Sequence, residues 1–131
     1  MTPRYAPPRL MIADDDPVFQ SLLESSLGAT FEVVGTVADT EAAIALARES
    51  QPDAALIDVE MPRGGGLRAV EGIRGVAPGT AIVMLSFDYA DTHVRELIQA
   101  GAIAYHRKGG DLQQLAESLI DSIAVHENER R

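Results

Sequence analysis

Short apolar segments alternate along this chain with longer segments whose apolar residues recur at helical spacing. Five of these segments favour buried strands, and an amphipathic stretch follows each one. The expected strands cover residues 10–13, 31–37, 54–58, 81–86 and 102–105. Strands that alternate with helices form a parallel sheet covered on both faces, because right-handed crossovers place helices on either side. The sequence therefore predicts an α/β fold, a doubly wound three-layer sandwich around a five-stranded parallel sheet.

Capping residues and glycines mark the ends of the expected helices. Asp16 followed by Pro17 predicts a helix start, since an aspartate cap and a proline in the first turn are both favoured there. The apolar stripe of this first helix consists of Phe19, Leu22, Leu23 and Leu27, and Gly28 ends it. The remaining helices are expected from Asp39-Thr40 to before Pro52, from 67 to Gly75, from 94 to Gly101 and from Asp111 to 123.

Length and composition limit what else the chain can be. With 131 residues, 46% of them hydrophobic, it suits one domain. The absence of cysteine excludes disulfides and thiolate nucleophiles, and a net charge of -9 argues against nucleic-acid binding by this domain alone. No apolar run approaches the roughly 20 residues of a membrane span, so we expect no membrane contact and a cytoplasmic location. We expect a disordered leader at 1–8, a domain at 9–126, and a polar tail or linker start at 127–131.

Polar side chains follow the carboxyl ends of four expected strands. These residues are Asp14 and Asp15 after the first strand, Asp58 after the third, Ser86 after the fourth and Lys108 after the fifth. In open parallel sheets ligands bind at this edge, so we expect these residues to converge there. Three carboxylates in one place repel one another unless a cation neutralises them, and an open oxygen cluster suits Mg²⁺. The sequence therefore predicts a magnesium site.

Asp58 is the expected nucleophile of this cluster. It ends a buried strand, and the loop after it contains Met61-Pro62 and three successive glycines, which leave the carboxylate accessible. Phosphoryl transfer needs mostly positioning and positive charge, which the metal and Lys108 supply, while Ser86 offers a hydroxyl donor. We therefore expect Asp58 to accept a phosphoryl group.

These residues, in this order and spacing, resemble the receiver domain of two-component response regulators over roughly residues 10–125. The resemblance rests on Asp14-Asp15, on Asp58 within Ile57-Asp58-Val59-Glu60-Met61-Pro62, on Gly66-Leu67, on Ser86, and on Lys108 within Tyr105-His106-Arg107-Lys108. It implies a flavodoxin-like fold with strand order 2-1-3-4-5. The segments at Asp14-Asp15-Asp16-Pro17 and Lys108-Gly109 are similar to those of receivers attached to helix-turn-helix output domains.

The resemblance also implies a role for each site residue. Asp58 would accept phosphate from the phosphohistidine of a sensor histidine kinase or a histidine phosphotransfer protein. Asp14, Asp15, Asp58 and the backbone carbonyl of Glu60 would hold Mg²⁺, or Mn²⁺ in its place. Lys108 would pair with the phosphoryl group, and Ser86 and Tyr105 would form a switch pair.

The output would be a changed face around the fourth helix, fifth strand and fifth helix, with homodimerisation on phosphorylation as one consequence. The domain would be a regulatory phosphoacceptor, not an enzyme beyond its own phosphorylation and dephosphorylation.

This sequence departs from the family pattern close to the site. Phe87 stands where a small residue is usual, Glu60 adds an acid beside Asp58, and Asp88 adds another nearby. We expect these three residues to alter access to Asp58 and the rates of phosphorylation and hydrolysis. Gly109-Gly110 stand where a proline is commoner.

Two other functions remain open from the sequence. A pseudo-receiver would use the same fold as a binding module without phosphorylation. A phosphatase of the haloacid dehalogenase type would use Asp14 as nucleophile and Asp16 as acid/base, although that leaves Asp58 without a role. The three histidines share no spacing with one another, and we expect them at the surface.

Overall fold

A computed structural model of the chain describes residues 6–87 and 93–130, which form five strands and five helices. Their order is β1 (Arg9–Ala13), α1 (Pro17–Leu27), β2 (Glu32–Val37), α2 (Thr40–Ser50), β3 (Ala54–Asp58), α3 (Gly65–Val76), β4 (Ala81–Ser86), α4 (His93–Ala100), β5 (Ala104–Arg107) and α5 (Leu112–Glu129). Within these ranges no helix combines the length and the hydropathy needed to cross a bilayer.

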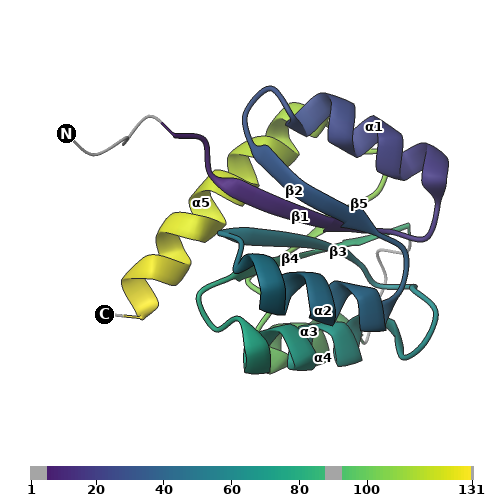
Figure 1. Cartoon of the computed structure of the whole chain (residues 1–131), viewed down its shortest axis with the longest axis vertical. Coiled ribbons are helices and arrows are strands. Elements are labelled where there is room, and N and C mark those ends of the chain that lie inside the picture. Colours follow the sequence, from purple (N-terminus) through teal and green to yellow (C-terminus); the bar gives the residue numbers. More distant parts are fainter. Residues whose placement is uncertain (1–5, 88–92, 131) are drawn as a thin grey trace.

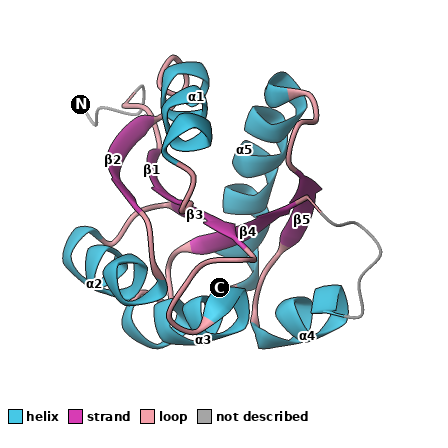
Figure 2. Ribbon diagram, turned by 90° about the vertical axis from the view of Figure 1, so that its right-hand side faces the viewer, coloured by secondary structure: helices cyan, strands magenta, loops and turns pink. Residues whose placement is uncertain are grey.

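The strands form one parallel sheet in the order β2-β1-β3-β4-β5, which confirms the expected fold. Helices α1 and α5 cover one face of the sheet, and α2, α3 and α4 cover the other (Figures 1 and 2). In the sheet, β2 lies on one side of β1 and β3 lies on the other, so the strand order reverses direction at β1. This reversal opens a crevice at the carboxyl ends of β1 and β3, where ligands bind in folds of this kind.

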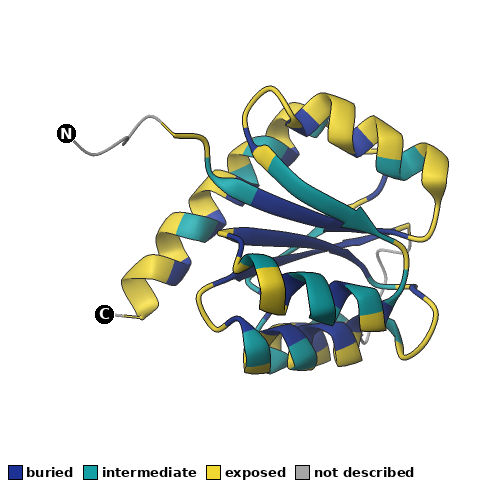
Figure 3. Ribbon diagram, viewed as in Figure 1, coloured by how far each residue is buried: buried dark blue, intermediate teal, exposed yellow. Residues whose placement is uncertain are grey.

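Two apolar layers hold the helices on the sheet. Successive side chains of a strand point to opposite faces. Leu10, Ile12 and Leu56 accordingly lie in the layer beneath α1 and α5, whereas Met11 and Ile57 lie in the layer above α2, α3 and α4. Strands β1, β3 and β4 are buried along nearly their whole length (Figure 3). Continuous burial explains why these strands are apolar without alternation.

Local capping signals place three helix starts as expected. Asp16 caps α1 by accepting hydrogen bonds from the backbone N–H groups of Val18 and Phe19, and Pro17 lies in the first turn. Asp39 caps α2 and Asp111 caps α5 in the same way. In each case the carboxylate satisfies N–H groups that have no partner within the helix.

The predicted boundaries of β5 and α3 are wrong by a few residues. Residues 101 and 102 complete the C-terminal turn of α4, where both backbone N–H groups donate to Leu97 O, so β5 begins only at Ala104. Helix α3 continues through Gly75 to Val76, because a helical glycine with open space around it does not force an end. Helix α5 continues to Glu129, so the polar residues 127–129 are helical.

The expectation of surface histidines is wrong for His126, which is only 7% exposed. Its Nε2 lies 2.7 Å from the backbone carbonyl of Pro78, so the end of α5 is attached to the turn before β4. The half-buried His106 on β5 contacts Ser118 Oγ of α5 at 2.6 Å. The side chain of His93 lies outside the described part of the chain.

Candidate functional site

The strand order brings the predicted site residues together. Asp14 follows β1, Asp58 ends β3, Ser86 ends β4 and Lys108 follows β5. Because β3 lies between β1 and β4, Asp58 occupies the middle of the edge and the others approach it from both sides. Asp14, Asp58 and Ser86 are at most 1% exposed. The site is therefore formed by backbone positions that the sheet fixes.

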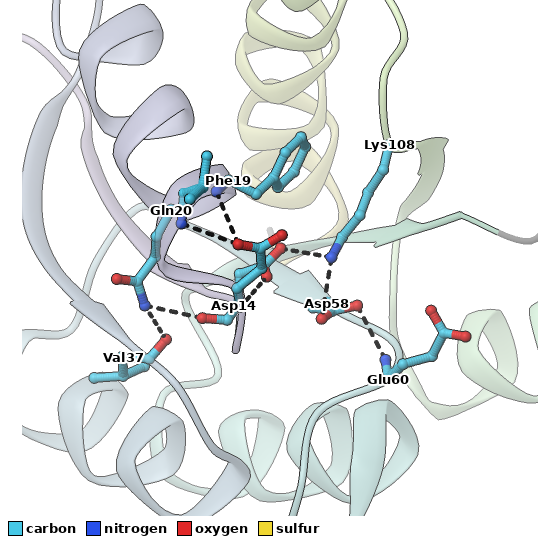
Figure 4. Close-up of polar contacts among 9 residues, drawn as sticks. Asp14, Phe19, Gln20, Val37, Asp58, Glu60 and Lys108 are labelled. Atoms are coloured by element: carbon cyan, nitrogen blue, oxygen red, sulfur yellow. Dashed lines mark hydrogen bonds and ion pairs between the residues drawn. The ribbon is translucent and has the colours of Figure 1, made fainter.

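Lys108 links the two buried carboxylates. Its Nζ lies 2.8 Å from Asp14 Oδ2 and 3.2 Å from Asp58 Oδ2, and its side chain is only 3% exposed (Figure 4). A buried ammonium needs such partners, because burial of an unpaired charge is strongly unfavourable. Lys108 therefore lies at the edge of the sheet where the sequence predicted it, and it contacts both Asp58 and Asp14; its pairing with a phosphoryl group remains a prediction.

The backbone of Asp16 and the side chain of Gln20 hold Asp14 in place. Its Oδ1 accepts a hydrogen bond from Asp16 N at 2.9 Å. The Gln20 side chain donates to the carbonyls of Asp14 and Val37 at 2.9 and 2.8 Å, which ties α1 to the ends of β1 and β2 (Figure 4). Gln20 had no signal in the sequence, since a half-buried polar residue on a helix predicts no particular partner.

The donor set fits a small divalent cation. Asp14, Asp15 and Asp58 each offer a carboxylate oxygen, and these oxygens lie within 4.8 Å of one another. Asp14 Oδ2 is buried and, among the described residues, has no hydrogen-bond partner of good geometry, although it contacts Lys108. Asp15 is exposed, so the cluster opens to water on one side. Carboxylate oxygens in a site that admits water are what Mg²⁺ prefers.

Glu60 lies beside the cluster through its backbone. Its N–H donates to Asp58 Oδ1 at 3.1 Å, whereas its exposed side chain extends away from Asp58 (Figure 4). The hydrogen bond fixes the orientation of the Asp58 carboxylate. That the Glu60 carbonyl binds metal, and that its side chain affects rates, remain predictions.

The loop after β3 is attached to the start of α2. Thr40, which is fully buried, donates from its hydroxyl to Gly65 O at 3.2 Å, and its N–H reaches Pro62 O at 3.4 Å. The loop has positive φ angles at Arg63, Gly64 and Gly65. Such backbone persists only where surrounding contacts maintain it. Thr40 therefore supports the loop that carries the Glu60 backbone.

Replacing Thr40 with valine is expected to lower the free energy of unfolding by about 1–2 kcal/mol, because the hydrogen bond from the buried Thr40 hydroxyl to the half-buried Gly65 carbonyl is lost. Urea denaturation of the wild type, Thr40→Val and Thr40→Ser measures the effect. Serine keeps the hydroxyl and should retain most of the stability. Equal stability of the valine and serine variants would contradict a role for the hydroxyl.

Burial and charge shift the pKa values of the central pair. Burial raises the pKa of Asp58 from 3.8 to about 6, although the Glu60 N–H and the Lys108 ammonium oppose this rise, and the nearby Asp14 adds to it. Burial alone would lower the pKa of Lys108, but its contacts with Asp14 and Asp58 outweigh that effect and raise it. Lys108 thus stays charged, and Asp58 is held in an environment that disfavours its own charge.

The raised pKa of Asp58 gives a pH dependence with a definite sign. Between about pH 4 and 6 the unfolded chain releases this proton while the folded protein retains it. In metal-free buffer this group's contribution to the free energy of unfolding should therefore decrease as the pH rises through this range. The difference between wild type and Asp58→Asn in urea denaturation from pH 4 to 8 isolates this contribution; a difference independent of pH would contradict it.

Ser86 and Tyr105 lie on the same face of the sheet. Met84 pairs with Tyr105 across β4 and β5, and Ser86 is two residues beyond Met84. Residues two apart on a strand point to one face, and Met84 and Tyr105 both belong to the layer beside α2, α3 and α4. Ser86 is buried and Tyr105 is half-buried. This arrangement is compatible with the predicted switch pair, whose movement remains a prediction.

Two phenylalanine rings cover the ammonium of Lys108. The ring centroids of Phe19 and Phe87 each lie 5.0 Å from Lys108 Nζ. Phe87 was predicted to modulate the site, but Phe19 was assigned only to the apolar stripe of α1. Asp88, the remaining predicted modulator, lies outside the described residues. Gly109 after Lys108 has a φ of 85°, which proline cannot adopt.

Asp16 has a structural role that excludes the phosphatase interpretation. Its Oδ1 accepts hydrogen bonds from Val18 N at 2.9 Å and Phe19 N at 3.3 Å as the cap of α1. That hypothesis required Asp16 as a free acid/base and left Asp58 unused, whereas Asp58 lies at the centre of the cluster.

Comparison with known proteins finds a family that matches most of the chain. The family described as response regulator receiver domain matches residues 10–120. The transcriptional regulatory protein YxjL of Bacillus subtilis is 37% identical over 117 residues, which are 88% of this chain and 52% of that protein. This chain spans about half the length of the curated relatives it matches.

Solved receiver structures superimpose closely. The receiver domain of the response regulator NarL from Mycobacterium tuberculosis has a TM-score of 0.86 and 25% identity, covering 91% of this chain and 98% of that one. A LuxR-family two-component response regulator from Aurantimonas sp. SI85-9A1 has a TM-score of 0.79 and 27% identity, covering 91% of this chain and 86% of that one.

Proposed function

Because this chain belongs to the response regulator receiver domains, which are phosphoacceptor regulatory domains, we propose that it is a signalling switch phosphorylated on Asp58. The observation that carries the proposal is the contact of the Lys108 ammonium with both buried carboxylates, Asp14 and Asp58. A cation fixed beside a buried carboxylate at the end of the central strand is what an anionic phosphoryl group requires.

Asp58 acts as the nucleophile. One of its carboxylate oxygens attacks the phosphorus of a phosphohistidine, the new O–P bond forms as the N–P bond breaks, and the imidazole leaves with the electron pair and takes up a proton. Lys108 pairs with the phosphoryl oxygens and the Ser86 hydroxyl donates to one of them. Asp14, Asp15, Asp58 and the Glu60 carbonyl would hold Mg²⁺, or Mn²⁺ in its place, which would supply further positive charge beside these oxygens.

Phosphorylation changes the output face. It adds about -1.5 to -2 charges at Asp58, which draws the Ser86 hydroxyl towards the phosphoryl group and turns Tyr105 inward on the same face. The affected surface consists of α4, β5 and α5. It controls an output domain or a partner, and homodimerisation on phosphorylation is one form that control can take.

The phosphoryl donor is a sensor histidine kinase or a histidine phosphotransfer protein in the cytoplasm. The net charge of -9 argues against nucleic-acid binding by this domain alone, so DNA binding would belong to an attached domain of the LuxR type. Phe87, Glu60 and Asp88 modulate donor access and the lifetime of the phosphorylated form.

Intact mass after incubation with acetyl phosphate tests the proposal. With Mg²⁺ present the chain should gain one phosphoryl group, and the gain should be absent in EDTA. Hydroxylamine should remove the group, because it cleaves acyl phosphates but leaves phosphoserine and phosphothreonine intact. No gain with either acetyl phosphate or a phosphorylated kinase would favour the pseudo-receiver, a binding module that works without phosphorylation.

A further inference from the structure

The Lys108 ammonium lies between two aromatic rings that come from different parts of the chain. Phe19 is in the first turn of α1, where its backbone N–H donates to the cap residue Asp16, and its ring is beside Lys108 (Figure 4). Phe87 follows the last residue of β4. Both ring centroids are 5.0 Å from Nζ, within the range of a cation–π interaction.

The two rings lie against the buried ammonium of Lys108, which has almost no contact with water. The Lys108 side chain is 3% exposed, so its ammonium depends on Asp14, Asp58 and the two ring faces. Cation–π attraction strengthens when the cation is desolvated. Phe87 is a large apolar side chain that is 62% exposed, so burial in the core does not explain its position. Its contact with the ammonium gives this exposed ring a role.

The ammonium occupies oxygens that a metal ion would need. Lys108 Nζ is 2.8 Å from Asp14 Oδ2 and 3.2 Å from Asp58 Oδ2, and both residues belong to the carboxylate cluster. A divalent cation bound to these carboxylates would lie close to the ammonium, and the two positive charges repel each other. Metal binding therefore requires Lys108 to give up part of its contact with Asp14, and the rings oppose that movement.

We propose that Phe19 and Phe87 form an aromatic clamp that holds Lys108 on Asp14 and Asp58 as an internal counterion and thereby weakens the binding of Mg²⁺. The two phenylalanines are positioning residues, since they act through Lys108. The inference rests on the Mg²⁺ site of the proposed function and identifies what sets its affinity.

Calorimetric titration with Mg²⁺ tests the clamp without any phosphoryl transfer. Phe19→Leu and Phe87→Leu keep an apolar side chain but remove the ring face, and each should bind Mg²⁺ about three- to tenfold more tightly, as expected for the loss of one cation–π contact. The third phenylalanine, Phe31, is in the core away from the site and provides the matched control. Phe31→Leu should leave the affinity unchanged.

A double-mutant cycle separates the clamp from steric access. Lys108→Met should itself bind Mg²⁺ more tightly, and in that background the two leucine substitutions should have no further effect. Unchanged or weaker Mg²⁺ binding in the leucine variants would overturn the proposal. An equal gain with and without Lys108 would also overturn it, because the rings would then act by blocking the entrance.

The lysine itself provides a second readout. Lys108 is the only lysine in the chain, so lysine-selective ¹³C labelling gives one ε-methylene signal. In the wild type this signal should be shifted upfield by the two rings, and each leucine substitution should move it towards the position of a free lysine. A wild-type signal at the free-lysine position would overturn the clamp. If the titrations succeed and phosphorylation fails, the clamp stands and only the proposed function is rejected.

Discussion

Asp58→Asn is expected to abolish phosphorylation and, in metal-free buffer, to make the protein more stable. The amide has no nucleophilic carboxylate oxygen, so intact mass should show no phosphoryl gain under conditions that label the wild type. The stabilisation follows from the pKa of about 6 in place of 3.8, since the folded protein keeps Asp58 ionised at neutral pH against its environment. With about 1.4 kcal/mol for each pKa unit, we expect the free energy of unfolding to rise by about 3 kcal/mol at pH 7.5.

The matched control for this variant is Asp121→Asn. Asp121 is exposed on α5, and its replacement removes the same charge without touching the site. This control should be phosphorylated like the wild type and should unfold at nearly the same urea concentration. A phosphoryl gain in Asp58→Asn would place the nucleophile elsewhere in the chain, and a loss of stability would show that Asp58 is not disfavoured in its charged form.

Lys108→Met is expected to produce the opposite change in stability. It leaves Asp14 and Asp58 buried without the cation that both contact. Removing one partner of a buried ion pair destabilises proteins by about 3–5 kcal/mol, so we expect a loss of about 3 kcal/mol in metal-free buffer. Saturating Mg²⁺ should restore most of this loss, because it binds the same carboxylates. Phosphorylation should be at least about 100-fold slower, a loss of roughly 3 kcal/mol of transition-state stabilisation.

Urea denaturation with EDTA or with Mg²⁺ measures the stability of this variant, and the time course of intact mass measures its rate. Arg95→Met, which removes an exposed cation from α4, should change neither quantity. Lys108→Arg keeps a charge and should recover part of the stability. If Lys108→Met were as stable as the wild type in EDTA, the ion pairs with Asp14 and Asp58 would carry no net stabilisation.

The sequence predicts the fold and most of the site because their determinants are local. Asp58 ends an apolar run and Asp14 follows another, so a parallel sheet alone places both carboxylates at one edge. The cap at Asp16 is likewise encoded by two adjacent residues. These local preferences agree with the final fold, because tertiary packing stabilises the same strand ends and helix cap that the local sequence favours.

The features that sequence reasoning misses depend on contacts between distant elements. Phe19 has the spacing of a core residue, and nothing in α1 indicates that its ring meets Lys108, 89 positions later. His126 is buried against the turn before β4, where the Pro78 carbonyl contacts its ring nitrogen. The start of β5 shifts by two residues because α4 needs residues 101 and 102 for its last turn. Each case is a tertiary contact for which the local sequence carries no signal.

The seclusion of Lys108 gives the domain an unusual chemical property. Within these 131 residues the only side-chain primary amine is 3% exposed and paired with two carboxylates. Acylating reagents attack a neutral, accessible amine, and Lys108 is neither while it is paired with Asp14 and Asp58. Its rate of acylation therefore reports how often Lys108 leaves Asp14 and Asp58, without a foreign label in the protein. A ligand that keeps Lys108 on these carboxylates would protect this side-chain amine, and one that draws Lys108 outward would expose it.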